Sequence, residues 1–310
     1  EIGVVVGHTE PEIRAALGDG SEWGVALTYI PQESPDGLAH AVKISRGFLG
    51  DEDFVMFLGD NVIQGGISSL IRAFSDNSWN SQIVLKQVEN PQAYGVAVLA
   101  EDGSIRQLIE KPKDVPAPSD LALVGIYMFD HNVFKAIEQI KPSARGELEI
   151  TDALQWLAAN GYDVFPHIHK GWWIDTGKPT DMLEANSHVL DETPVSVADD
   201  AIIENSEVDS RVSLQAGAKI VNSIVRGPTI IGKGAVIEDS YIGPYTSIYT
   251  NVHVRKCEID RCIILEDTVI DDLSVILRDS LIGRHAHITS KRTRPQGVQL
   301  NLGDYSKLQI

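Results

Sequence analysis

The stretch Phe54-Val55-Met56-Phe57-Leu58-Gly59-Asp60-Asn61 decides how the first half of this sequence folds. Five apolar residues run directly into a Gly-Asp-Asn turn, a pattern typical of a buried parallel strand that ends at a loop. In open α/β sheets, ligands bind beyond the carboxyl ends of such strands. Asp60 is therefore either a carboxylate placed at the mouth of a cleft or an ordinary turn-forming residue.

The composition limits the function classes. The chain has 310 residues and a net charge of −18. This length is sufficient for two domains, and the acidic balance argues against nucleic acid or an anionic membrane as a partner. No apolar run approaches the ~18 residues of a membrane span. Cys257 and Cys262 are the only cysteines, which fits a cytoplasmic protein, and we expect both thiols to be buried as small apolar groups rather than metal ligands.

Strand-like and helical stretches alternate through residues 1–192. Strands are indicated at Ile2 to Val6, Val25 to Ile30 and Ser81 to Val88, with helices between them. Such alternation predicts a Rossmann-like α/β domain, with a mostly parallel sheet and helices on both faces. A capping box of Thr9 and Glu12 is expected to open the first helix.

Two further strand ends carry charged residues. Asp175 ends a second apolar strand, and Lys111 follows a third. Two carboxylates on neighbouring strands, together with substrate phosphates, would suit Mg²⁺. Lys111 is either a point charge for a phosphate or a solvated surface lysine. Glu110 and Tyr94 are candidates for binding sugar hydroxyls.

The loop from Pro31 to His40 opens a predicted helix. Gly37 at the helix start would allow a planar ligand to approach the backbone, and the Gln32 amide can both donate and accept hydrogen bonds. The alternative is a plain strand-to-helix loop, because Pro-Asp-Gly is a common turn.

The second half of the sequence is a repeat with a period of six. Aliphatic residues recur at this spacing with two slips, at Ile202, Val208, Leu214, Ile220, then Ile224, Ile230, Val236, Ile242, Ile248, Val254, then Ile264, Ile270, Ile276, Ile282 and Ile288. This period predicts a left-handed parallel β-helix over residues 193–310, with a final strand-like tail from Gly297 to Ile310 as a cap. The inward phase is ambiguous where aliphatic residues are consecutive. We expect the β-helix to organise a homo-oligomer.

Several short motifs occur in a specific order ahead of the hexapeptides: Gln32 with Gly37-Leu38-Ala39, Leu58-Gly59-Asp60, Tyr94-Gly95-Val96, Glu110-Lys111-Pro112 and Asp175-Thr176-Gly177. In this order the chain resembles the long-form glucose-1-phosphate thymidylyltransferases. These are sugar-1-phosphate nucleotidylyltransferases with a C-terminal β-helix. The resemblance covers essentially the whole sequence.

The resemblance implies a role for each motif. Gln32, Pro35 and Gly37 would bind the pyrimidine base, and Asp60 and Asp175 would hold Mg²⁺. Lys111 would bind the sugar phosphate. The residues that would line the sugar site are Tyr94, Gly95, Glu110, Gly125 and Tyr127. The implied reaction joins dTTP and glucose 1-phosphate to give dTDP-glucose and pyrophosphate, with Asp60, Lys111 and Asp175 as the catalytic residues.

One family feature does not occur in the sequence. The family carries a Gly-rich loop with an Arg and a following Lys on its first strand–loop–helix unit, which cradles the triphosphate. Nothing before Glu1 supplies it, and from the size of such a unit we expect on the order of 30–50 residues to be missing.

Three alternatives remain open. UTP could replace dTTP, because the two bases differ by one methyl group. A hexapeptide β-helix could instead carry acyl transfer, for which His253, His285 and His287 are candidate bases. A homologue without the Gly-rich loop could bind a nucleotide sugar without turning it over.

Overall fold

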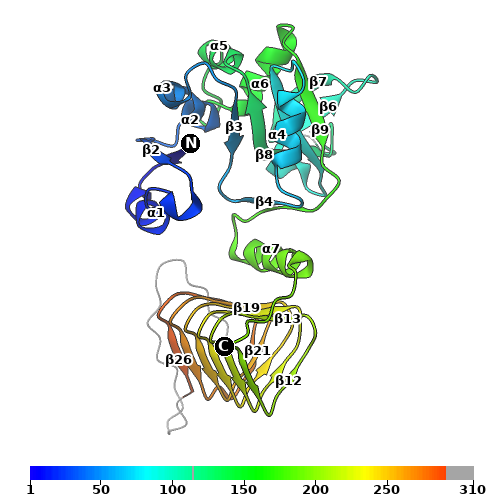
Figure 1. Cartoon of the computed structure of the whole chain (residues 1–310). Helices are drawn as coiled ribbons and strands as arrows, with labels where there is room; N and C mark the ends of the chain where they lie inside the picture. Colours follow the sequence, from blue (N-terminus) through cyan, green and yellow to red (C-terminus); the bar gives the residue numbers. More distant parts are fainter. Residues whose placement is uncertain (114, 291–310) are drawn as a thin grey trace. The chain divides into compact units, whose positions relative to one another are not determined.

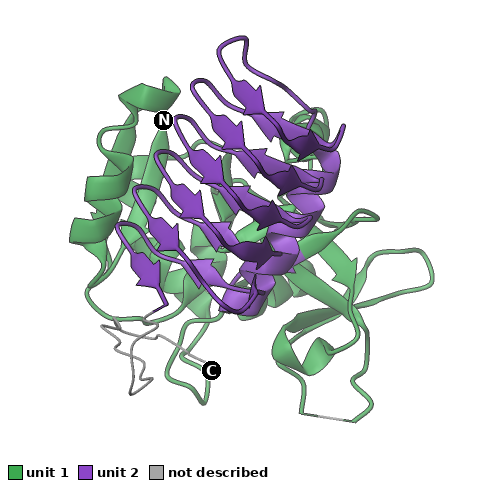
Figure 2. Cartoon of the chain, turned by 90° about the horizontal axis from the view of Figure 1, so that it is seen from below, with its two compact units in different colours: residues 1–173 green, residues 174–310 purple. Residues whose placement is uncertain are grey.

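The computed structural model describes residues 1–113 and 115–290. The chain divides into two compact units, residues 1–173 and residues 174–310 (Figure 2). The predicted capping tail from Gly297 to Ile310 lies outside the described residues. None of the helices in the described part of the chain is both long and apolar enough to cross a membrane.

A six-stranded sheet forms the centre of the first unit (Figure 1). Its order is β7-β6-β8-β5-β9, and β3 also pairs with β8. The strands are β3 (Phe54–Phe57), β5 (Ser81–Gln87), β6 (Gly95–Leu99), β7 (Ile105–Glu110), β8 (Leu121–Phe129) and β9 (Val164–Ile168). β5 and β9 pair in parallel, and β3, β5 and β6 are each antiparallel to β8. Four strands therefore run one way, which confirms the predicted α/β class with a parallel-rich sheet.

Helices cover both faces of this sheet. β8 is buried along almost its whole length, and its alternate side chains enter two different cores. Its Leu123, Tyr127 and Phe129 pack with helices α2 (Leu38–Ile44), α5 (Asn132–Gln139) and α6 (Ile150–Ala159). Its Val124, Ile126 and Met128 pack with α4 (Ser68–Ser75). β8 is thus the strand around which the unit is built.

Smaller elements complete the first unit. β1 (Ile2–Val6) pairs in parallel with β2 (Leu27–Pro31), and α1 (Glu10–Leu17) lies between them in the chain. Thr9 makes no side-chain capping hydrogen bond, so the predicted capping box is wrong. β4 (Asn61–Ile63) pairs with β10 (Trp173–Asp175). The short helices are η1 (Ser21–Trp23), α3 (Arg46–Leu49) and η2 (Pro91–Ala93).

The second unit is a parallel β-helix, as predicted, with three stacked sheets. The first contains β11 (Ile202–Glu204), β14 (Lys219–Val221), β17 (Val236–Glu238), β20 (His253–Arg255), β23 (Val269–Asp271) and β26 (His287–Thr289). The second contains β12 (Glu207–Val208), β15 (Ile224–Val225), β18 (Tyr241–Ile242), β21 (Glu258–Asp260) and β24 (Leu277–Arg278). The third contains β13 (Val212–Leu214), β16 (Thr229–Ile231), β19 (Thr246–Ile248), β22 (Ile263–Ile264) and β25 (Leu281–Ile282).

The coil length corrects the inward phase of the repeat. Lys219 pairs with Ile202 and Val236 pairs with Lys219, a step of 17 residues, so one side of each such coil has five residues instead of six. The buried residues are accordingly Val225, Ile231 and Ile237, whereas the predicted Ile224, Ile230 and Val236 are only partly buried. A corner residue with positive φ closes the short side, at Asn205, Asn222, Asp239 and Lys256. Asn and Asp tolerate this conformation better than most residues.

Helix α7 (Pro179–Glu192) packs on the β-helix. Asn186 Nδ2 donates to the Tyr245 carbonyl at 3.0 Å, and Ser247 Oγ donates to Asn186 Oδ1 at 2.6 Å. Arg211 forms an ion pair with Asp191 at 2.7 Å. These contacts place α7 in the second unit, whereas the sequence analysis placed the domain boundary after residue 192.

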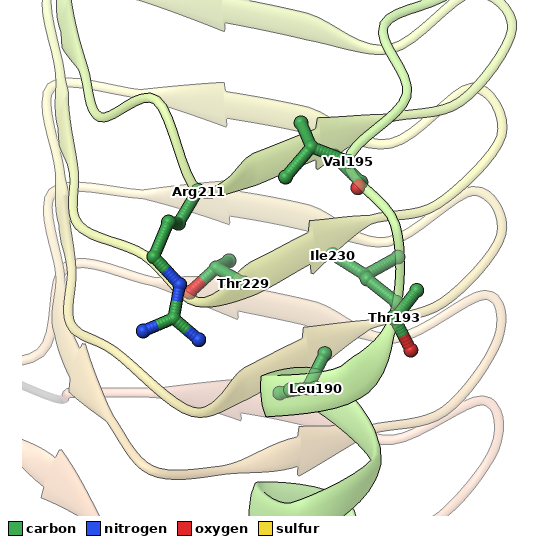
Figure 3. A pocket seen from close by; sticks show the side chains of 7 residues that line it. Leu190, Thr193, Val195, Arg211, Thr229 and Ile230 are labelled. Atoms are coloured by element: carbon green, nitrogen blue, oxygen red, sulfur yellow. The ribbon is translucent and has the colours of Figure 1, made fainter.

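A small hollow lies where α7 ends. Leu190, Thr193 and Val195 face Arg211, Ser213, Thr229 and Ile230 of the first coils across a volume of about 20 Å³ (Figure 3). This volume holds about one water molecule, so the hollow is a packing gap and not a ligand site.

In the core of the second unit, Cys257 and Cys262 are buried thiols, as predicted. Burial raises the pKa of Cys262 to about 11.

Candidate active site

The loop after β3 carries Asp60, and the neighbouring Asn61 fixes it. Asn61 is 7% exposed, and its Nδ2 donates to Asp60 Oδ1 at 2.7 Å. Its Oδ1 accepts from the Gly125 backbone at 3.2 Å and from Trp173 Nε1 at 2.6 Å. The Asp60 carboxylate is therefore held by a side chain whose other bonds reach β8 and β10.

Four predicted site residues come together where β6 meets β7. Gly95 pairs with Glu110 across the two strands, and the Lys111 backbone donates to the Tyr94 carbonyl at 3.1 Å. A Cβ at Gly95 would lie 3.0 Å from a Glu110 oxygen and 2.9 Å from Thr151 Oγ1, so any larger residue there would displace these two side chains. Lys111 has a φ of 41°, a strained conformation for a non-glycine residue and one often found at functional sites.

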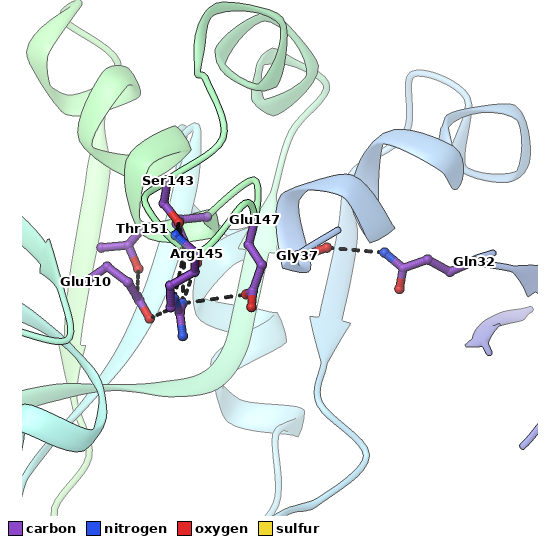
Figure 4. A network of polar contacts seen from close by, with 8 residues as sticks. Gln32, Gly37, Glu110, Ser143, Arg145, Glu147 and Thr151 are labelled. Atoms are coloured by element: carbon purple, nitrogen blue, oxygen red, sulfur yellow. Dashed lines mark hydrogen bonds and ion pairs between the residues drawn. The ribbon is translucent and has the colours of Figure 1, made fainter. Parts of the chain in front are cut away.

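Glu110 belongs to a charged network around Arg145 (Figure 4). Arg145 lies 3.1 Å from Glu110, 3.6 Å from Glu147 and 2.8 Å from Glu149. The hydrogen bond to Glu149 is the main cause of a raised Arg145 pKa. Thr151 Oγ1 donates to the second Glu110 oxygen at 2.7 Å. The network fixes both oxygens of a carboxylate that the resemblance assigns to the sugar.

The loop carrying Gln32, Pro35 and Gly37 is hydrogen-bonded to Leu148, next to Glu147 and Glu149 of the charged network. The Leu148 backbone donates to the Asp36 carbonyl at 2.7 Å, and the Leu148 carbonyl accepts from Ala39 at 3.0 Å. A Cβ at Gly37 would collide with the Leu148 backbone, and Gly37 has a φ of 102°. Glycine is needed here for both reasons, so the loop leading into α2 is a rigid feature.

Tyr127 and Gly125 lie on β8 with different surroundings. Tyr127 is buried, and burial is the first cause of its raised pKa, followed by the charge of Glu110. The space over Gly125 is occupied by Leu58 and by the amide of Asn61. Gly125 therefore allows the loop before Asp60 to pack closely on the sheet. Tyr94 makes an edge-to-face contact with Trp173, with ring centroids 5.3 Å apart.

The donor chemistry of the predicted metal ligands fits Mg²⁺. Asp60 and Asp175 provide carboxylate oxygens, the ligand type that Mg²⁺ prefers. Asp175 ends β10 and falls in the second unit, where its Oδ1 accepts from the Gly177 backbone at 3.1 Å. Among the described residues there is no cluster of three or more potential metal ligands. A Mg²⁺ held by one or two carboxylates and the substrate phosphates does not need such a cluster.

Sequence patterns did not reveal Asn61, Arg145 and Thr151 as parts of the site. Arg145 lies in a loop without periodicity, so its position follows only from the fold. Asn61 directly follows Asp60, and this adjacency was the one available signal. The assignment of Gly125 and Tyr127 to the site came from the resemblance alone. The roles of all the predicted site residues stay predictions.

The histidines considered for acyl transfer are all exposed. His253 and His287 are exposed on β20 and β26. His285 lies 3.7 Å from Asp267, with 74% of its side chain exposed. The larger hollow of the second unit, about 550 Å³, is lined by Ile203, Asn205, Ser206, Glu207, Asn222, Ser223 and Ile224 and contains none of these histidines.

Comparison with known proteins shows the family of this chain. The profile of the nucleotidyl transferase family matches residues 1–192. The chain belongs to the nucleotidyl transferase family. It is 45% identical over 310 residues to a glucose-1-phosphate thymidylyltransferase of Streptomyces griseus, spanning all of this chain and 86% of that protein. A low-salt glycan biosynthesis nucleotidyltransferase of Haloferax volcanii is also 45% identical, with 100% of this chain and 87% of that protein covered.

The structure of this chain is similar to a solved structure. It is a Bacillus anthracis protein classed as a glucose-1-phosphate thymidylyltransferase, in complex with a sucrose. The identity is 33% and the TM-score 0.57, over 63% of this chain and 78% of that chain. The resemblance found from short motifs is thus confirmed at the level of the family.

Proposed function

We propose that this protein joins dTTP and glucose 1-phosphate to form dTDP-glucose and pyrophosphate. The single observation that carries the proposal is the grouping of Tyr94, Gly95, Glu110 and Lys111 at one end of the β6–β7 pair. This grouping supports the proposal that Glu110 binds sugar hydroxyls and that Lys111 binds the phosphate. The 45% identity with the Streptomyces griseus enzyme supports the choice of substrates.

The proposed reaction is a direct phosphoryl transfer. A phosphate oxygen of glucose 1-phosphate attacks the α-phosphorus of dTTP, and the bond from that phosphorus to the bridging oxygen of the β-phosphate breaks, which releases pyrophosphate. Catalysis of this kind depends on positioning and charge neutralisation. Lys111 binds the sugar phosphate, Glu110 orients the sugar, and Gln32, Pro35 and Gly37 hold the base.

The same proposal gives Asp60 and Asp175 the role of Mg²⁺ ligands. A bound Mg²⁺ supplies positive charge against the triphosphate. Asn61 keeps the Asp60 carboxylate in one orientation through its 2.7 Å hydrogen bond. Arg145 and Thr151 keep the Glu110 carboxylate in one orientation in the same way.

Replacing Asp60 tests the metal role. Asp60→Asn keeps the shape and an oxygen that accepts from Asn61, but it removes the negative charge. Loss of a metal ligand costs several kcal/mol in the transition state, so Mg²⁺-dependent pyrophosphate release is expected to fall by about a thousandfold. The control is Asp76→Asn, at the C-terminal end of α4. Unimpaired pyrophosphate release by Asp60→Asn would exclude this role.

A further inference from the structure

We propose that His40 determines which bases this protein accepts, by fixing the orientation of the Gln32 amide. His40 holds Gln32 Nε2 and thereby presents Gln32 Oε1 to the ligand, which selects bases with an imino N–H, such as thymine and uracil, over cytosine. This inference rests on the proposed function, in which Gln32 contacts the base.

The Gln32 amide has two contacts on its nitrogen. Nε2 lies 3.3 Å from the Gly37 carbonyl oxygen and 3.0 Å from His40 Nδ1. Figure 4 shows the amide nitrogen directed at Gly37 and the amide oxygen turned to the other side. Within the described part of the chain, no hydrogen bond engages Gln32 Oε1.

The Gly37 carbonyl settles the assignment of the amide nitrogen and oxygen. A carbonyl oxygen can only accept, so the group that faces it must be the NH₂ of Gln32. This carbonyl is itself fixed, because it accepts from the Ala41 backbone at 3.2 Å in the first turn of α2. With the opposite orientation, two oxygens would face each other.

The orientation of the amide in turn sets the state of His40. Because Nε2 of Gln32 is a donor, His40 Nδ1 must accept, and the imidazole proton is on Nε2 of the ring. The Asp36 carboxylate is 3.9 Å from Nδ1, beyond hydrogen-bond distance, and accepts from Ser34 Oγ at 2.7 Å instead. Gln32 is therefore the hydrogen-bond partner of His40 Nδ1.

His40 holds the orientation that the Gly37 carbonyl sets, because it gives the Gln32 NH₂ group a second acceptor. Its side chain is 24% exposed, and its neighbours Ala39 and Val42 anchor α2 in the core. The imidazole is thus carried by a fixed helix, and the Gln32 backbone is held by its hydrogen bond to the Val6 carbonyl at 2.7 Å. Two donors of one NH₂ group are satisfied by two fixed acceptors, and Oε1 is the group left for a ligand.

The bases differ in what they offer to Oε1. Thymine and uracil carry a hydrogen on N3, which Oε1 can accept. Cytosine has a lone pair at N3, which would face the lone pairs of Oε1. A site built to accept a hydrogen bond discriminates strongly against a ligand that cannot donate it.

Equilibrium binding tests the role of His40 without turnover. Dissociation constants of dTTP and dCTP are measured by titration calorimetry for the wild type, His40→Leu, His40→Asn and the control His131→Leu, an exposed position at the start of α5. His40→Leu removes the acceptor, so the preference for dTTP over dCTP is expected to fall by about tenfold or more. His40→Asn retains an acceptor near the Nδ1 position and is expected to keep most of the preference.

The outcomes separate this inference from the proposed function. If the wild type prefers dTTP and His40→Leu keeps the same ratio of dissociation constants, the role of His40 is wrong and that of Gln32 stands. If the wild type shows no preference, Gln32 does not select the base and this inference fails, whereas the proposed reaction is tested separately by pyrophosphate release. A ratio of two constants is insensitive to a general loss of folded protein.

Discussion

Asn61 shows how one residue can connect several parts of a site. Its amide accepts from Gly125 and Trp173 and donates to Asp60. Asparagine suits this position because one side of its amide accepts and the other donates. An aspartate here would place a second negative charge against Asp60 and lose the donor.

Gln82 is a polar residue in a fully buried position. It lies on β5 with no exposed surface, and neither its Oε1 nor its Nε2 has a hydrogen-bond partner among the residues that the structure describes. An unpaired buried amide costs about 1–3 kcal/mol. We therefore expect Gln82→Met to raise the free energy of unfolding by about 1 kcal/mol, as measured by denaturant titration. Gln107→Met, at an exposed position of β7, is the control, and a destabilised Gln82→Met would contradict the prediction.

His167 gives a pH dependence with a defined sign. Burial lowers its pKa below 6.5 in the folded protein. The unfolded chain therefore binds the proton more readily, and stability is lost as the pH falls below about 6.5. His167→Gln is expected to lose less thermal stability than the wild type between pH 7 and pH 5. Equal losses, or the same effect from His131→Gln at an exposed site, would contradict the role of burial.

At the scale of elements, the sequence predicted where strands of the first unit end. It did not predict which residues of the β-helix strands face inward. Asp60 and Lys111 follow β3 and β7 as the apolar runs indicated. The β-helix phase failed where two aliphatic residues are adjacent, as in Ile230-Ile231, because either fits a six-residue period. The choice depends on a five-residue side closed by a positive-φ corner, a feature that periodicity alone does not encode.

The corrected phase makes a direct prediction about β17. Ile237 is fully buried in the β-helix core, whereas its neighbour Val236 is only partly buried. We expect Ile237→Ala to cost about 2–5 kcal/mol, because a cavity is left in a packed core. Val236→Ala should cost less than about 1.5 kcal/mol. Scanning calorimetry measures both, and a larger effect from Val236→Ala would favour the original six-residue phase.

At the scale of the whole molecule, the composition already separates two architectures. All five Trp and all seven Phe precede Asp175, and the repeat follows. This contrast predicted two architectures, and the strand–helix alternation and the six-residue period predicted an α/β unit followed by a β-helix. It could not predict Arg145, or the bonding of the Gln32 loop to the segment around Leu148, because both depend on how distant segments meet. A homo-oligomer organised by the β-helix remains a prediction.

The measurement that tests the central claim most directly is product analysis after incubation with Mg²⁺, glucose 1-phosphate and either dTTP or UTP. We predict stoichiometric pyrophosphate and a nucleoside diphosphate glucose, with a higher kcat/KM for dTTP. Faster turnover of UTP would change the substrate and leave the reaction class intact. Binding of the nucleotides without pyrophosphate release, in protein whose fold is verified by circular dichroism, would contradict the account.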